Sequence, residues 1–184
     1  MDEKALIAAA REGDRAAYGE LYRRFAPTVH GVLLARVAPD VVNDLLQDVF
    51  LKAMLAIRNL RDHDHFGAWL CAIARNCARD FYRDRREQQP HEGMIEHLGT
   101  QERVTSNLDA RHILAALQKL PDAYRETLAL RLVEGLTGPE IAERTGLSHG
   151  SVRVNLHRGM QLLREALSAA AARPKRTNEQ RQSL

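Results

Sequence analysis

Apolar residues recur at intervals of three and four along most of the chain, which is the period of one face of an α-helix. Alanine, leucine, arginine and glutamate dominate these stretches, and strand-like alternation is nearly absent. A polar stretch interrupts the helical pattern once, and the pattern ends before the C-terminus. The sequence therefore predicts an all-α protein with two small helical domains, over residues 1–86 and 109–168.

Residues 87–108 lie between the predicted domains and differ from both in composition. They contain Pro90 and Gly93 and have more acidic than basic side chains, which is typical of a flexible linker. We therefore expect a flexible acidic linker here. Residues 169–184 contain Pro174 and have more basic than acidic side chains, and we expect them to form a disordered basic tail.

The second domain carries the local signals of a helix-turn-helix. Thr137 and Glu140 have the spacing of a capping box, which starts a helix. Gly146 can take the positive φ that ends this helix, and Ser148 can cap the next one. In such a motif the second helix, here from His149 onward, lies in the major groove of DNA.

The polar face of that second helix is a candidate DNA-binding surface. Between His149 and Arg164 every charged side chain is an arginine. Arginine pairs well with guanine edges and asparagine with adenine edges. The alternative is an αα-hairpin with a solvated basic face. The residues outside the apolar stripe that suit duplex DNA are Arg153, Asn155, His157 and Arg158.

The stretch from Asp44 to Met54 predicts a helix with two distinct faces. One face is broadly apolar, while Asp44, Gln47 and Asp48 share the opposite side, with Leu51 one turn further on. An acidic surface beside an exposed leucine suits docking on a basic partner helix. The alternative is a solvated acidic face with one stray leucine.

The helix predicted over residues 66–86 has basic, amide and aromatic side chains outside its apolar stripe. Basic groups neutralise phosphates and aromatic rings stack on unpaired bases, so this surface suits single-stranded DNA. Asp80 and Asp84 favour a competing interpretation, a surface of salt bridges along the helix. The polar loop before the helix could hold a flipped base. The candidate residues are Arg61, His63, Asp64, His65, Arg75, Asn76, Arg79, Tyr82 and Arg83.

Composition and the remaining motifs reduce the number of function classes that the sequence allows. The chain has 184 residues, of which 45% are hydrophobic and 28% charged, as in an ordinary soluble protein. Cys71 and Cys77 fit no disulfide framework, and we expect buried thiols in a reducing cytoplasm. His63, Asp64 and His65 with Cys71 match no familiar metal site, so we expect no metal. The sequence shows no nucleophile with a base partner and no Gly-rich phosphate loop, so we expect no cofactor and no enzymatic activity. No apolar run is long enough for membrane insertion.

Two ordered sets of motifs together resemble the extracytoplasmic-function sigma factors, a group of the sigma-70 family. The resemblance covers most of the chain except the linker and the tail. The first set comprises Asp44–Phe50 and Phe66–Arg83, and the second comprises Leu120–Leu128, Val133–Thr137, Glu140–Ala142, Gly150–Arg153 and Leu156–Arg158.

The resemblance implies a non-catalytic subunit that binds core RNA polymerase and directs promoter recognition, DNA melting and transcription initiation. The segment from Asp44 to Leu51 would dock on the β′ clamp helices, and the candidates between Arg61 and Arg83 would read the −10 element as a single strand. The helix from His149, with Ser151 added to its contact residues, would read the −35 element as duplex, and its domain would sit on the β flap.

By analogy, an anti-sigma factor is an expected further partner. The principal alternative is a stand-alone helix-turn-helix regulator, which would bind DNA without polymerase. A helical metalloenzyme is a more distant alternative.

Overall fold

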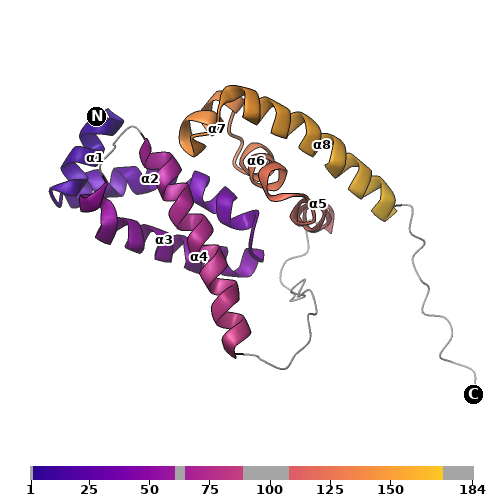
Figure 1. Cartoon of the computed structure of the whole chain (residues 1–184), viewed down its shortest axis with the longest axis horizontal. Coiled ribbons are helices and arrows are strands. Elements are labelled where there is room, and N and C mark those ends of the chain that lie inside the picture. Colours follow the sequence, from indigo (N-terminus) through magenta and orange to yellow (C-terminus); the bar gives the residue numbers. More distant parts are fainter. Residues whose placement is uncertain (1, 61–64, 89–107, 172–184) are drawn as a thin grey trace, which may run out of the picture.

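The structure is a computed structural model that describes residues 2–60, 65–88 and 108–171. Within these residues all regular secondary structure is helical, which confirms the predicted all-α fold with two helical domains (Figure 1). Residues 61–64, most of the predicted linker and most of the predicted tail lie outside the described residues. No helix in the described ranges combines the length and apolarity needed to cross a membrane.

The first domain begins with two helices whose starts are fixed by aspartate caps. The Asp2 carboxylate accepts the backbone N–H of Glu3, and the Asp14 carboxylate accepts those of Ala16 and Ala17. Such caps satisfy N–H groups that have no partner within the helix. The domain consists of α1 (Glu3–Arg11), α2 (Arg15–Leu34), η1 (Pro39–Val41), α3 (Val42–Ala56), η2 (Ile57–Asn59) and α4 (Phe66–Gln88).

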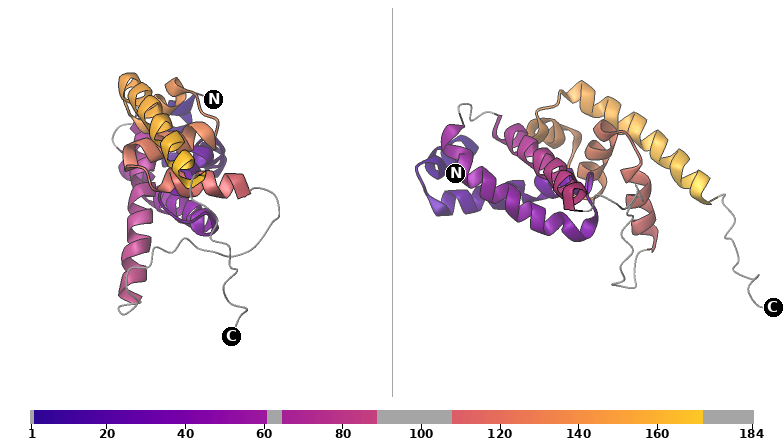
Figure 2. Two further views of the ribbon diagram at one scale, coloured as in Figure 1. Left: turned by 90° about the vertical axis from the view of Figure 1, so that its right-hand side faces the viewer. Right: turned by 60° about the horizontal axis from the view of Figure 1, so that its bottom comes forward.

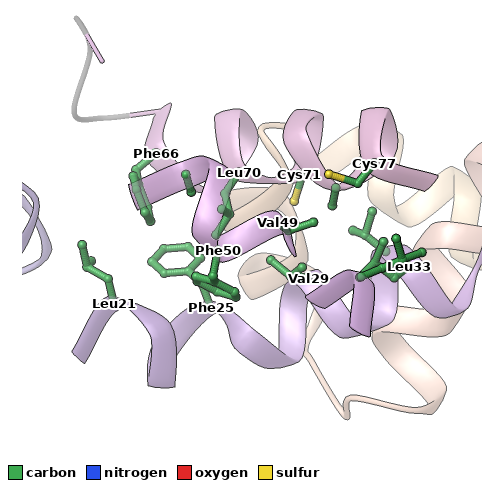
Figure 3. Close-up of a cluster of buried hydrophobic side chains, with 14 of the residues drawn as sticks. Leu21, Phe25, Val29, Leu33, Val49, Phe50, Phe66, Leu70, Cys71 and Cys77 are labelled. Atoms are coloured by element: carbon green, nitrogen blue, oxygen red, sulfur yellow. The ribbon is translucent and has the colours of Figure 1, made fainter. Parts of the chain in front are cut away.

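The core of the first domain lies where α2, α3 and α4 meet (Figure 3). Phe25 of α2 and Phe66 of α4 meet edge to face, with ring centroids 5.1 Å apart. Cys71 and Cys77 of α4 are buried free thiols, as predicted. Burial raises the pKa of Cys71 to about 12, so its reactive thiolate is disfavoured.

The second domain contains the predicted helix-turn-helix. At its start the Thr137 hydroxyl accepts the backbone N–H of Glu140, while the Glu140 carboxylate accepts that of Thr137, which confirms the capping box. Gly146 has φ +73°, and the Ser148 hydroxyl accepts the backbone N–H of Ser151. The domain consists of α5 (Leu108–Gln118), α6 (Asp122–Leu132), α7 (Gly138–Thr145) and α8 (His149–Ala171).

The two domains pack directly against each other. α6 lies on α2 and α7 lies on the first half of α4, so the second domain covers one side of the first (Figures 1 and 2). The consecutive residues Glu126–Leu130 of α6 are all buried, because α6 packs against α8 of its own domain and against α2 of the other. This arrangement decides which candidate side chains remain accessible.

Candidate polymerase and DNA interfaces

α3 has one buried face and one exposed face. Val42, Leu45, Val49, Phe50 and Ala53 are buried in the core. Asp44, Gln47, Asp48 and Leu51, the candidate docking residues, are all exposed and follow one another at helical spacing. The structure therefore brings all four together on one surface.

This surface extends further than the sequence analysis predicted. Met54 and Leu55 continue the same face by one turn, with 46% and 73% of their surface exposed, beside Leu51 at 53%. Three neighbouring exposed apolar side chains at the end of an acidic helix face are characteristic of a protein interface. The spacing of three and four from Leu51 was the signal that could have identified them.

Along α4 most of the candidate single-strand residues are exposed. Asn76, Arg79, Tyr82 and Arg83 are exposed, and so is His65 just before the helix. Arg83 forms ion pairs with Asp80 at 3.0 Å and Asp84 at 3.6 Å, so part of the competing salt-bridge interpretation also holds. Arg61, His63 and Asp64 lie outside the described residues.

Arg75 differs from the other candidates on α4, since it is half-buried against the second domain. Its Nε donates to Oε2 of Glu126 at 3.1 Å, and its Nη2 donates to Oε1 at 2.7 Å. This hydrogen bonding raises the pKa of Arg75. Tyr82 also makes a contact at one end, as its hydroxyl donates to the carbonyl of Arg36 at 3.1 Å.

On α8 the candidate duplex-binding residues divide into two groups. Ser151, Arg153, His157 and Arg158 are exposed and available to a ligand. Asn155 is half-buried, and its Nδ2 donates to the hydroxyl of Thr127 on α6 at 3.4 Å. In this structure Asn155 therefore faces its own domain.

An open groove of about 720 Å³ runs between α8, the start of α7 and α6. Arg131, Arg153 and Arg164 line it, with Val152 and Leu156 among its apolar lining residues. Arg164 was not predicted from the sequence to belong to this site. A groove with three arginines and an apolar floor has the charge to attract a polyanion.

No cluster of histidine, cysteine or acidic residues in the described ranges is arranged to hold a metal ion. Of the possible metal ligands, His63 and Asp64 lie outside those ranges, and Cys71 is fully buried. The chemistry of the described surfaces is therefore that of recognition: an acidic and apolar helix face, a basic and aromatic helix face, and a helix-turn-helix with a basic groove.

These features define a two-domain, helix-turn-helix protein of transcription. The sigma-70 region 2 family model matches residues 21–88, and the sigma-70 region 4 model matches residues 110–163. The chain belongs to the sigma-70 family and is an extracytoplasmic-function RNA polymerase sigma factor. It directs RNA polymerase in promoter recognition and transcription initiation and is itself non-catalytic, so the stand-alone regulator and the metalloenzyme are set aside.

Two curated relatives are matched over 92% of their length. RNA polymerase sigma factor CarQ of Myxococcus xanthus is 34% identical over 161 residues, covering 85% of this chain and 92% of CarQ. ECF RNA polymerase sigma factor ShbA of Streptomyces griseus is 32% identical over 176 residues, covering 87% of this chain and 92% of ShbA.

Two solved structures have a similar fold. The structure of CnrH in complex with the cytosolic domain of CnrY matches with a TM-score of 0.62 at 28% identity, covering 91% of this chain and 97% of CnrH. The sigma factor RpoE in complex with the anti-sigma factor NepR from Bartonella quintana matches with a TM-score of 0.59 at 23% identity, covering 82% of this chain and 96% of RpoE.

Proposed function

We propose that the exposed face of α3 is the surface with which this sigma factor docks on core RNA polymerase, at the β′ clamp helices. The observation that supports this most strongly is the unbroken line from Asp44 and Asp48 to Leu51, Met54 and Leu55, all exposed on one side of the helix. The acidic side chains would steer a basic partner helix, and the apolar ones would be desolvated at its centre.

The two domains then divide the reading of the promoter. The α4 face, with Arg79, Asn76 and Tyr82, reads the −10 element as an unpaired strand, because it offers charge, hydrogen bonds and a ring for stacking. The exposed half of α8, led by Arg153, reads the −35 element as duplex in the major groove. The second domain also contacts the β flap.

An anti-sigma factor completes this proposal. The similar structure of CnrH was determined in complex with the cytosolic domain of CnrY, which supports a comparable protein partner for this chain. Because core polymerase and promoter DNA are its working partners, we place the protein in the cytoplasm.

Run-off transcription with bacterial core polymerase on pooled promoter fragments of the source genome tests the proposal directly. We expect promoter-specific transcripts only when the protein is added, and two shared sequence elements upstream of their start sites. An absence of transcripts would contradict the proposed partnership with core polymerase and promoter DNA.

A further inference from the structure

Glu126 of α6 holds a buried ionic contact between the two domains. Its carboxylate accepts two hydrogen bonds from Arg75 of α4, and its Oε2 lies 2.8 Å from Nη1 of Arg36, which follows α2. The Glu126 side chain is only 8% exposed, and that of Arg36 only 15%. One carboxylate of the second domain thus pairs with two arginines of the first.

The helices beside this contact are shaped for close approach. A Cβ added at Gly31 of α2 would lie 2.8 Å from Cδ2 of Leu130, and one added at Gly67 of α4 would lie 2.5 Å from the carbonyl oxygen of Arg144. Alanine favours a helix over glycine, but at Gly31 its methyl group would crowd Leu130 of the second domain. Glycine at this position therefore suits the close packing of α2 against the second domain.

Further polar contacts cross the same boundary. Nη1 of Arg144 on α7 donates to the carbonyl of Arg24 and to the hydroxyl of Thr28, at 2.5 and 3.2 Å. The side-chain amide of Gln118 donates to the carbonyl of Val37 at 3.0 Å. Ionic, hydrogen-bonded and apolar contacts therefore all form between the domains in this one relative position.

This packing of the second domain on the first, which we call the closed arrangement, leaves the proposed docking surface on α3 exposed. It covers part of the proposed single-strand surface on α4. The α3 face remains exposed, so core polymerase can reach it, whereas Arg75 on the α4 face is engaged by Glu126. The names of the two promoter elements place them about 25 base pairs apart, or roughly 85 Å at 3.4 Å per base pair. Because α7 contacts α4 directly, the closed arrangement cannot span this distance and cannot contact the two promoter elements at the same time.

We propose that the closed arrangement is an autoinhibited state of the free sigma factor, in which Glu126 occupies Arg75 in place of a promoter phosphate. The inference rests on the proposed role of α4 in reading the unpaired strand. A carboxylate and a phosphate both accept paired N–H groups from one guanidinium, so Glu126 is a suitable substitute. Docking of polymerase on α3 precedes opening, and opening frees Arg75 for DNA.

Such a contact suits a switch because it is specific without being strong. A buried ion pair adds little net stability, since its charges lose their hydration, yet removing one partner leaves the others buried and unpaired. The closed state is then favoured in the free protein and can be overcome by the binding free energy of polymerase.

The test compares the wild-type chain with Glu126→Gln and Arg36→Glu. Both variants weaken the contact, one from each domain, and neither alters a proposed DNA contact. Asp122→Asn is the matched control, because Asp122 is an exposed acid on the same helix that pairs only locally with Arg125. Small-angle X-ray scattering gives the radius of gyration, and fluorescence anisotropy gives the affinity for a labelled single strand from a promoter found by run-off transcription.

We expect both variants to have a larger radius of gyration and to bind the strand roughly 5- to 20-fold more tightly, within the usual range of coupling between two sites. Asp122→Asn should match the wild type, and adding Arg75→Ala to Glu126→Gln should remove the gain. An unchanged radius in both variants would show that Glu126 does not hold the domains closed and would overturn its proposed role as a switch, and expansion without tighter binding would overturn the masking of Arg75.

A separate measurement distinguishes failure of this inference from failure of the proposed α4 role. In preassembled holoenzyme, Arg75→Ala should reduce promoter melting, which permanganate reactivity of unpaired thymines reports. If melting by that holoenzyme is normal, Arg75 is not a DNA contact, and Glu126 is not a phosphate substitute. Expansion of Glu126→Gln alone would then report only on how the domains are held together.

Discussion

At the scale of single residues, the start of α7 depends on one reciprocal exchange of hydrogen bonds. The Thr137 hydroxyl is one of its two members, and the Glu140 carboxylate is the other. We expect Thr137→Ala to lower the free energy of unfolding by about 1 kcal/mol, because an N–H at the start of the helix loses its acceptor. Urea denaturation of the full chain measures this. Thr137→Ser, which keeps the hydroxyl, should retain most of the stability, and equal losses in the two variants would contradict the capping role.

Arg153 carries the prediction for duplex recognition, because it is exposed on α8 and lines the basic groove. If it pairs with a base edge, Arg153→Ala should weaken holoenzyme binding to the −35 element by about 1–3 kcal/mol. Competition binding on promoters with an intact or a scrambled −35 element measures the difference. An equal loss on both promoters would show that Arg153 contacts phosphate instead.

The residues that local sequence determines were the most predictable. The capping box at Thr137, the turn at Gly146 and the cap at Ser148 each depend on neighbours within a few positions, and all three were predicted. Arg75 and Asn155 looked equally polar and accessible, but their hydrogen-bond partners are Glu126 and Thr127, distant in sequence. No helical period reveals such a partner.

At the scale of elements, one face of α3 packs into the core, and the other is exposed for a partner to bind. Asp48 lies on the exposed face, so Asp48→Arg should leave the unfolding free energy within about 0.5 kcal/mol of the wild type. It should also abolish binding to core polymerase, because a cation replaces an acid opposite a basic partner helix. Affinity capture of core polymerase and thermal melting measure the two effects.

The control for Asp48→Arg is Glu12→Arg, the same reversal at an exposed acid outside α3. It should bind polymerase like the wild type. If both reversals weaken binding equally, the effect is one of net charge and the docking face has been assigned wrongly. If neither weakens it, polymerase docks elsewhere.

The burial pattern of α6 could not be predicted from hydrophobic periodicity. Its buried residues run consecutively from Glu126 to Leu130, because helices of both domains pack on it. A pattern read at the period of a helix assumes one buried face, so Glu126 and Thr127 would be assigned to solvent. Their burial follows only from the arrangement of the two domains.

At the scale of the whole molecule, the number and type of domains followed from sequence, but their contact did not. Domain type is encoded in repeated local patterns over many residues, whereas the contact depends on a few positions such as Gly31, Gly67 and Glu126. A glycine inside a predicted helix was the one available signal, and by itself it does not identify what approaches. The relative position of domains is therefore the feature that three-dimensional structure adds here.

The closed arrangement should also respond to pH through His30, which lies on α2 with Nδ1 2.6 Å from Oε1 of Glu134 in the second domain. The hydrogen bond to Glu134 raises the pKa of His30 above 6.5, although partial burial opposes it. In the open protein this partner is absent and the pKa returns toward 6.5, so protonation favours closure. The contribution of protonated His30 to the stability of the closed arrangement is complete below about pH 6.5. It is lost as the pH rises through the raised pKa of His30.

We therefore expect the radius of gyration of the free protein to increase as the pH rises from about 6.5 through the raised pKa of His30, measured by small-angle X-ray scattering at constant ionic strength. His30→Gln removes the titrating group and should make the radius independent of pH over this range. Glu126→Gln retains His30 and Glu134, so it should be more open at every pH and still respond. Expansion on acidification, or an unchanged pH response in His30→Gln, would show that the pair between His30 and Glu134 does not help to hold the domains together.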